Sequence, residues 1–269
     1  MIWTTRPASD QTGGVAAKVA GKGPTVVLIH GVGLRGEAWQ TAGEALARDF
    51  EVHAVDMPGH GRSPLCGAAT LADFAASIAE YVRALSAPVR LAGHSMGAMV
   101  ALDIAGRGGT KVSHVAAINA IYRRDEIAAV AVRKRAANLS ASRVSDPEGT
   151  LSRWFGSAPQ GALARAAEDC RRWLTQADPA GYKAAYSVFA TEDGPSDAAL
   201  RDMSAAALFL TGALDPNSTP EMSAAMSKIC RAGSVCVFED AAHMLPLTHA
   251  EQTARTLKAF FLNEGDAHD

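Results

Sequence analysis

Three residues of the chain could carry out nucleophilic chemistry together, namely Ser95, Asp215 and His243. Ser95 stands at the centre of the pattern G-x-S-x-G, written Gly93-His94-Ser95-Met96-Gly97. A serine hydroxyl is a poor nucleophile at neutral pH, so it needs a base within hydrogen-bond reach, and that base needs an orienting partner. Histidine and a carboxylate are suited to these two roles. The set predicts attack of the Ser95 hydroxyl on a carbonyl group.

The residues around Ser95 predict a strand, a sharp turn and a helix. Residues 89–92 form a short apolar run typical of a buried strand, and residues 98–105 have an apolar helical pattern. A serine on such a turn is a nucleophile elbow, where side chains in place of the glycines would collide with the neighbouring strand and helix. The serine lies above the helix N-terminus, where backbone N–H groups favour a developing negative charge.

Apolar runs that alternate with helical patterns predict an α/β fold with a mostly parallel central sheet flanked by helices. Residues 25–29 are uniformly apolar, which is typical of a central parallel strand buried on both faces. Ligands bind at the carboxyl ends of such strands, and Ser95, Asp215 and His243 each follow an expected strand. The expected strands are 15–19, 25–29, 51–55, 89–92, 112–119, 207–212 and 235–238, and the expected helices are 39–50, 71–85, 98–105 and 248–262.

Residues 121–191 interrupt this alternation, because they contain no clear strand and suggest several helices. We expect them to form a helical cap inserted into a core domain made of residues 1–120 and 192–269. The segment contains eleven Lys and Arg residues against seven Asp and Glu. Such a surplus is usually a solvated face, and it weakly favours a substrate with a carboxylate remote from the scissile bond. Among the cap aromatics, Trp154 and Phe155 are the pair expected to contact substrate.

The composition is that of an ordinary globular protein. The chain has 269 residues, of which 48% are hydrophobic and 20% charged, and a formal net charge of −2. This charge argues against nucleic acid or an anionic membrane surface as a partner. The first residues lack the features of a signal peptide, and no apolar run could span a membrane, so we expect a cytoplasmic protein, either monomer or homodimer. The four cysteines form no C-x-x-C pair, which argues against a zinc or redox site.

Five motifs in order give the chain a resemblance to the α/β-hydrolase superfamily, in particular to its capped esterase, lactonase and carbon–carbon hydrolase branch. They are Ile29-His30-Gly31-Val32-Gly33, Asp56-Met57-Pro58-Gly59-His60-Gly61-Arg62-Ser63, Gly93-His94-Ser95-Met96-Gly97, Gly212-Ala213-Leu214-Asp215 and Ala242-His243.

The resemblance implies a role for each residue of the site. Ser95 would be the nucleophile, His243 the general acid and base, and Asp215 the carboxylate that orients the imidazole. The oxyanion hole would be formed by the backbone N–H groups of Val32 and Met96. Gly33 would contribute to substrate binding, and no metal or organic cofactor is implied.

Some residues allow a second interpretation. Asp240 lies near His243 in the sequence, and some relatives take the acid from after the strand that ends here at Asn119, where the next carboxylate is Asp125, several residues on. His30, His60 and His94 lie on loops that converge, but no carboxylate or cysteine joins them at metal-ligand spacing. We therefore expect them to make structural hydrogen bonds rather than to bind a metal.

The reaction that we expect is hydrolysis of a small carboxylic ester or lactone through an acyl-enzyme. Cleavage of a carbon–carbon bond in a vinylogous diketone would use the same residues. Acyl transfer or perhydrolysis would require another nucleophile to outcompete water. A non-catalytic receptor for a small ligand is an alternative of a different class, because such proteins can retain the three residues.

Overall fold

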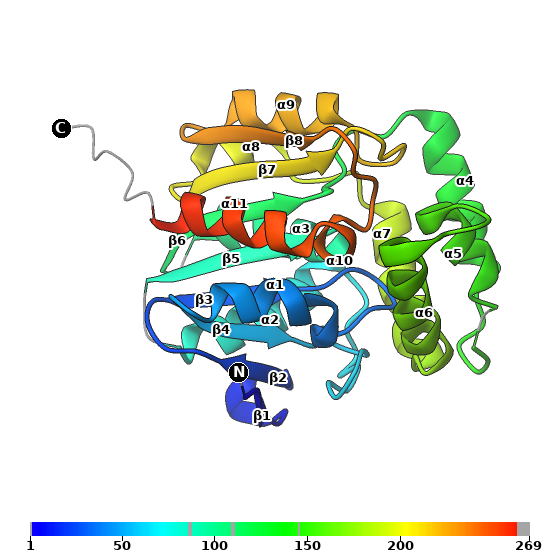
Figure 1. Ribbon diagram of the computed structural model, residues 1–269, viewed down its shortest axis with the longest axis horizontal. Helices are drawn as coiled ribbons and strands as arrows, with labels where there is room; N and C mark the ends of the chain where they lie inside the picture. Colours follow the sequence, from blue (N-terminus) through cyan, green and yellow to red (C-terminus); the bar gives the residue numbers. More distant parts are fainter. Residues whose placement is uncertain (1, 86–87, 109–110, 145, 263–269) are drawn as a thin grey trace.

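The structure, a computed structural model, describes residues 2–85, 88–108, 111–144 and 146–262. Eight described strands form one sheet in the order β1-β2-β4-β3-β5-β6-β7-β8 (Figure 1). The strands from β4 across to β8 are parallel, whereas β1 and β2 are antiparallel additions at one edge. Their bounds are β1 Thr4–Arg6, β2 Ala17–Ala20, β3 Thr25–Ile29, β4 Glu51–Val55, β5 Val89–His94, β6 Val112–Ile118, β7 Ala206–Gly212 and β8 Gly233–Phe238.

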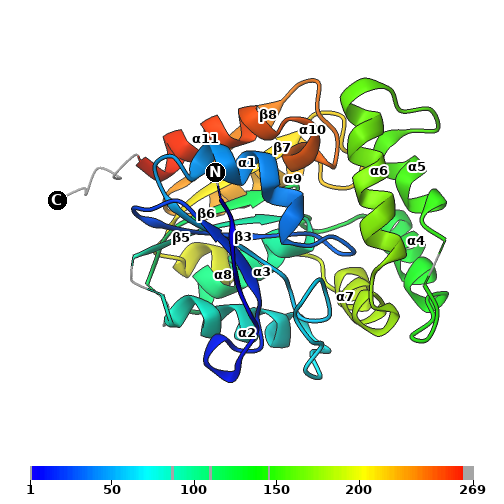
Figure 2. The ribbon, with the colours of Figure 1, turned by 60° about the horizontal axis from the view of Figure 1, so that its bottom comes forward.

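Five described helices lie between β6 and β7, and no strand lies among the described residues of this connection. The first four are α4 Glu126–Ala137, α5 Glu148–Phe155, α6 Gly161–Thr175 and α7 Pro179–Thr191, and we refer to them as the cap helices. They lie together beyond one end of the sheet, on the side away from the C-terminus (Figures 1 and 2). α6 is amphipathic, and its buried face includes Cys170, Trp173 and Leu174. This face packs against α5 and against Leu34 and Met244 of the loops that follow the strands.

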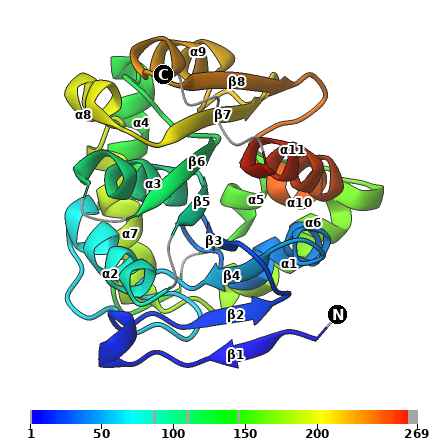
Figure 3. The same ribbon diagram turned by 90° about the vertical axis from the view of Figure 1, so that its left-hand side faces the viewer.

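The remaining helices cover the two faces of the sheet (Figure 3). One face carries α1 Gln40–Leu46, α10 Leu245–Thr248 and α11 Ala250–Leu262. The other carries α2 Leu71–Arg83, α3 Met96–Arg107, α8 Asp197–Asp202 and α9 Pro220–Ile229. Two short 3₁₀ helices, Asp10–Thr12 and Gly36–Trp39, lie near the start of the chain. Each face buries its own hydrophobic cluster, so β3, which is buried along its whole length, needs apolar side chains on both sides.

The expected elements match most of the observed ones. β3 and β4 have the bounds expected from the sequence, and β5 extends beyond its expected end to His94. The helix expected at 39–50 is shorter, since α1 ends at Leu46, and the one expected at 248–262 is divided into α10 and α11. The sequence suggested an opening strand or hairpin over residues 1–24 without bounds for β1, and α8 and α9 were not expected. β1 is a three-residue edge strand of polar residues, of which Arg6 is half-buried, and it pairs with β2, so it has no apolar pattern of its own.

No described helix is both long enough and apolar enough to cross a membrane.

Candidate active site

Ser95 lies on a strained turn between β5 and α3. Its backbone angles are φ 56° and ψ −118°, and its N–H donates a hydrogen bond to the Ile118 carbonyl at 2.8 Å. A Cβ atom on Gly93 would lie 2.0 Å from the Gly97 carbonyl oxygen, and one on Gly97 would lie 2.4 Å from the carbonyl oxygens of Ile29 and His30. Only glycine fits at these two positions, which explains both glycines of the motif.

The structure brings Ser95, His243 and Asp215 into one hydrogen-bonded line. His243 Nε2 lies 3.2 Å from Ser95 Oγ, and His243 Nδ1 lies 2.7 Å from Asp215 Oδ2. The three residues follow β5, β8 and β7, whose carboxyl ends meet at one edge of the parallel sheet. The imidazole can therefore donate from Nδ1 to the carboxylate and accept the serine proton at Nε2, which is the arrangement that activates a serine.

The carboxylates considered as alternatives lie elsewhere. Asp240 is exposed and its Oδ1 lies 3.4 Å from His249 Nε2. Asp125 caps the N-terminus of α4, where its side chain accepts the Ala128 N–H at 2.7 Å. Asp215 is thus the carboxylate that faces His243.

Asn119 joins this group, although we did not expect it from the sequence. It follows β6, and its side-chain Nδ2 donates to Asp215 Oδ2 at 2.8 Å, the same oxygen that faces His243. Its φ of 50° lies in the left-handed region, which asparagine tolerates better than most residues. The Asn217 N–H holds the other carboxylate oxygen of Asp215 at 2.9 Å. The only signal in the sequence was the position of Asn119 at a strand end that can supply the acid in relatives.

The environment of Asp215 keeps its carboxyl group ionised. Burial alone would raise its pKa, but His243 and the hydrogen bonds from Asn217 and Asn119 outweigh burial and lower the pKa below its ordinary value. A carboxylate that stays negative can stabilise an imidazolium at His243.

Two backbone N–H groups near Ser95 are free of partners among the described residues. Met96 is the first residue of α3, so no carbonyl lies one turn back within its helix. Val32 lies in the loop after β3, where its neighbours Gly33 and Leu34 donate their N–H groups to His60 and to the Gly31 carbonyl. Val32 lines the same cavity as Ser95.

The three loop histidines make structural hydrogen bonds. His30 Nε2 accepts the Met57 N–H at 2.9 Å, and His60 Nε2 accepts the Gly33 N–H at 3.1 Å. His94 Nε2 donates to the His243 carbonyl at 2.8 Å, which helps to hold the loop that carries His243. Burial lowers the pKa of His60 to about 4 and that of His94 to about 3, and it also lowers the pKa of His30 well below its ordinary value. All three are therefore neutral at pH 7.

A small cavity of about 60 Å³ opens beside Ser95 and His243, and we call it the inner cavity. Its core side includes Val32 and Asn217. Its cap side includes Arg135, Arg153 and Trp154, together with Tyr186 and Phe189 of α7. The cap helices therefore supply both cations and aromatic rings to the space above Ser95.

Two residues expected to contact substrate lie away from the inner cavity. Phe155 is buried in the cluster between α5 and α6. Neighbouring residues on a helix point about 100° apart, so Phe155 and Trp154 face different directions. Gly33 faces Leu174 and Tyr182, where a Cβ atom would lie 2.6 Å from Leu174 Cδ2. Neither residue lines the inner cavity.

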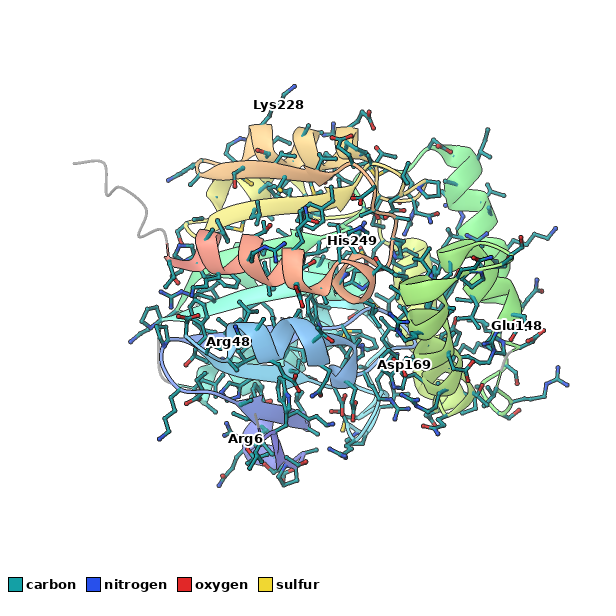
Figure 4. The ribbon with its side chains drawn as sticks, in the orientation of Figure 1. Arg6, Arg48, Glu148, Asp169, Lys228 and His249 are labelled. Carbon is teal, nitrogen blue, oxygen red and sulfur yellow. The ribbon has the colours of Figure 1, made fainter. Side chains whose placement is uncertain are left out.

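Several cap arginines that do not line the inner cavity have a carboxylate partner. Arg171 binds Glu148 and Glu168, Arg172 binds Asp169, and the Glu148 side chain lies on the outer side of the cap (Figure 4). By contrast, no carboxylate in the described part of the chain pairs with Arg135 or Arg153. Instead, Arg135 Nε donates to the Tyr186 hydroxyl at 3.0 Å, and Arg153 Nη2 donates to Thr150 Oγ1 at 2.8 Å.

Comparisons with known proteins identify the family. The chain is 37% identical over 242 residues to (E)-2-((N-methylformamido)methylene)succinate hydrolase of Acinetobacter baylyi. The aligned region covers 89% of this chain and 91% of that protein. The solved structure of the enol-lactonase from Burkholderia xenovorans has a TM-score of 0.80 at 20% identity and covers 92% of this chain and 96% of its own. That of E-2-(acetamidomethylene)succinate hydrolase has a TM-score of 0.77 at 22% identity and covers 97% of this chain and 99% of its own. The model of the alpha/beta hydrolase family matches residues 26–256. The chain therefore belongs to the alpha/beta hydrolase family and is a hydrolase.

Proposed function

We propose that this protein is a serine hydrolase that cleaves an acyl bond in a small anionic substrate. The observation that carries the proposal is the hydrogen-bonded line of Ser95, His243 and Asp215, which opens on a cavity lined by two arginines that have no carboxylate partner in the described part of the chain. The first feature supports acyl chemistry, and the second supports a negatively charged substrate.

In the proposed reaction, Ser95 Oγ attacks the acyl carbon while its proton passes to His243 Nε2. The tetrahedral oxyanion accepts hydrogen bonds from the N–H groups of Val32 and Met96, each of which is worth about 10²–10³ in rate in comparable sites. The C–O bond then breaks, and His243 gives its proton to the departing oxygen. A water molecule attacks the acyl-enzyme with His243 as base, and this step releases the acid and restores the Ser95 hydroxyl.

The cap side of the inner cavity supports the proposed substrate class. A guanidinium group recognises a carboxylate through paired charge-assisted hydrogen bonds, and Arg135 and Arg153 have no intramolecular carboxylate to compete for them among the described residues. The relative from Acinetobacter baylyi is named as a hydrolase of a substituted succinate, which is a small dicarboxylate. We therefore propose a substrate with a carboxylate a few bonds from the scissile acyl group.

The favoured scissile bond is the C–O bond of an ester or lactone. The named substrate of the same relative carries an N-formyl group, so hydrolysis of an amide C–N bond is a second candidate that this likeness favours. The same three residues can perform either reaction, because the leaving nitrogen would take its proton from His243 as the oxygen does.

The first test compares p-nitrophenyl acetate hydrolysis by the wild type and by Ser95→Ala. We expect kcat/KM to fall by about 10³ or more, since losing one member of such a triad costs this much. Equal slow rates for the two proteins would contradict the proposal and would favour a non-catalytic ligand-binding protein.

The second test compares monomethyl succinate with methyl butyrate, which has a methyl group where the first has a carboxylate. We expect Arg135→Gln and Arg153→Gln each to lower kcat/KM for monomethyl succinate by about ten- to hundredfold and to leave methyl butyrate within about twofold. Arg165→Gln is the matched control, because Arg165 is another cap arginine but does not line the inner cavity. A similar loss on both substrates would argue against an anion site.

To distinguish the scissile bonds, ester C–O, amide C–N and carbon–carbon, the wild type is assayed under the same conditions with three compounds. They are monomethyl succinate, (E)-2-((N-methylformamido)methylene)succinate and a vinylogous diketone. Faster Ser95-dependent turnover of the second compound would assign the C–N reaction. Turnover of a vinylogous diketone alone would instead assign carbon–carbon bond cleavage.

A further inference from the structure

A second, larger cavity lies within the cap, and we call it the outer cavity. Its volume is about 190 Å³, against about 60 Å³ for the inner cavity. Gly149 and Thr150 of α5, Leu174 of α6, and Tyr182 and Tyr186 of α7 are among the residues that line it. Ser95 and His243 do not line it, so the outer cavity is separate from the site where bonds would be made and broken.

The two cavities share one wall. Arg135, Thr150, Arg153 and Tyr186 line both of them. Two hydrogen bonds join these four residues in pairs, from Arg135 to Tyr186 and from Arg153 to Thr150. If the carboxylate of a substrate binds Arg135 or Arg153, the outer cavity therefore adjoins it and could hold another group of the same substrate.

The outer cavity is suited to an uncharged ring. Its walls include the apolar side chains of Leu139, Val144 and Leu174. The rings of Tyr182 and Tyr186 lie with their centroids 5.9 Å apart at an angle of 35°, and both line the cavity. Burial raises the pKa of Tyr182 to about 12, so its phenol stays neutral at pH 7.

The size of the outer cavity also suits a ring. An engineered apolar cavity of about 150 Å³ in another protein binds benzene. The volume here, about 190 Å³, is enough for a group of that size. Guanidinium groups stack on aromatic faces, so the arginines of the shared wall could contact such a ring as well as a carboxylate.

We propose that the outer cavity is a binding subsite for an aromatic ring of the substrate, linked by a short chain to the carboxylate that binds at the shared wall. The preferred substrate would then be an aryl-substituted carboxylate that also carries the scissile acyl group. This proposal rests on the anion site of the proposed function and extends it to a larger substrate.

The test uses benzylsuccinate and methylsuccinate, two dicarboxylates without an ester bond that differ in a phenyl ring. Their dissociation constants for the wild type are measured by isothermal titration calorimetry. We expect benzylsuccinate to bind about tenfold more tightly, because the ring leaves water for an apolar cavity. Equal binding of the two compounds would overturn the proposal.

A variant that fills the outer cavity tests whether the preference for benzylsuccinate arises there. Gly149→Phe suits this purpose, because a Cβ atom at Gly149 would have only Arg153 Nη1 within 4 Å, at 3.7 Å. We expect the preference for benzylsuccinate to fall below about threefold in this variant. Gly149→Ala adds a Cβ without filling the cavity, and Leu163→Phe adds a ring on an exposed part of α6 that lines neither cavity. Both controls should keep the preference of the wild type, and a preference that survives Gly149→Phe would overturn the proposal.

The same proteins separate this proposal from the proposed function. Ser95-dependent hydrolysis of monomethyl succinate without any preference for the benzyl compound would overturn the ring subsite alone. Absence of hydrolysis together with a benzyl preference that Gly149→Phe removes would overturn the proposed reaction and support the subsite. If neither dicarboxylate binds, both the anion site and the ring subsite are overturned.

Discussion

At the scale of single residues, Asp215 is held from three sides. Oδ2 of Asp215 forms hydrogen bonds with His243 Nδ1 and with the Asn119 amide, and Oδ1 accepts one from the Asn217 N–H. Among the described residues the buried Oδ1 atom of Asn119 has no hydrogen-bond partner, so the hydrogen bonds that orient this side chain come from Nδ2. Asn119 therefore acts as a positioning residue, which fixes the carboxylate that in turn fixes the imidazole.

We predict that Asn119→Gly lowers kcat by about ten- to hundredfold with little change in KM, because a hydrogen bond to a charged group is lost. Glycine retains the left-handed backbone conformation, so the variant removes mainly the amide. The acid limb of the pH profile of kcat should move to higher pH, since the amide helps to lower the pKa of Asp215.

The control for Asn119→Gly is Arg123→Gly. Arg123 also has a positive φ, of 53°, but its side chain pairs with Asp197 away from Ser95. It should leave the pH profile unchanged. An unchanged kcat and pH profile in Asn119→Gly would show that the amide does not position Asp215.

At the scale of elements, the position of α7 depends on a close crossing with the loop after β4. A Cβ atom on Gly181 of α7 would lie 2.1 Å from the Gly59 carbonyl oxygen. Backbone atoms cannot give way as a flexible side chain can, so this crossing requires glycine. α7 also carries Tyr186, which lines both cavities, and Phe189, which lines the inner one.

We predict that Gly181→Ala displaces α7, lowering the free energy of unfolding by about 1–3 kcal/mol as in other overpacked sites. Because Tyr186 moves with the helix, kcat/KM for monomethyl succinate should fall by about ten- to hundredfold. Urea unfolding and steady-state kinetics measure the two effects.

Gly149→Ala provides the comparison in the unfolding experiment, since Gly149 lies in a cap helix with open space around it. It should raise the free energy of unfolding by about 0.5–1 kcal/mol, because glycine is unfavourable within a helix. If Gly181→Ala behaved in the same way, the crossing with Gly59 would not be tight.

At the scale of the whole molecule, three buried neutral histidines connect the loops at the carboxyl edge of the sheet. His30 holds the loop after β4 through Met57, His60 holds the loop after β3 through Gly33, and His94 holds the loop after β8 through His243. Their protonation would put positive charge where the fold has excluded water. The stability of this edge, and of the fold with it, therefore depends on pH.

We predict that the free energy of unfolding falls as the pH drops below about 6.5. His60 has a pKa of about 4 in the folded protein, against 6.5 ordinarily, so between these values the unfolded chain binds more protons. His60 alone should account for a loss of roughly 2 kcal/mol between pH 7 and pH 5. Urea unfolding at the two pH values measures this loss.

His60→Gln tests whether protonation of His60 causes this loss of stability, because a glutamine amide oxygen can accept the Gly33 N–H but does not titrate. The variant should lose less stability than the wild type between pH 7 and pH 5. An equal loss in both proteins would mean that His60 does not contribute to the pH dependence.

The sequence by itself determined the features that depend on local patterns. The strand patterns of β3 and β4 and the strand-turn-helix context of Ser95 lie within short segments, and the order of Ser95, Asp215 and His243 is read directly from the chain. Because parallel strands bring their carboxyl ends to one edge, these local patterns sufficed to predict the central sheet and the meeting of the three residues.

Only the tertiary structure decided the features that depend on packing between distant segments. Asn119 meets Asp215 across 96 residues of sequence, and no local pattern specifies that contact. The orientation of α5 decides that Trp154 rather than Phe155 faces the inner cavity, and the packing of the cap decides that Arg171 and Arg172 pair with carboxylates whereas Arg135 and Arg153 do so with none among the described residues. Side chains that meet in space need not follow any period along the chain, so these contacts become visible only once the helices are packed.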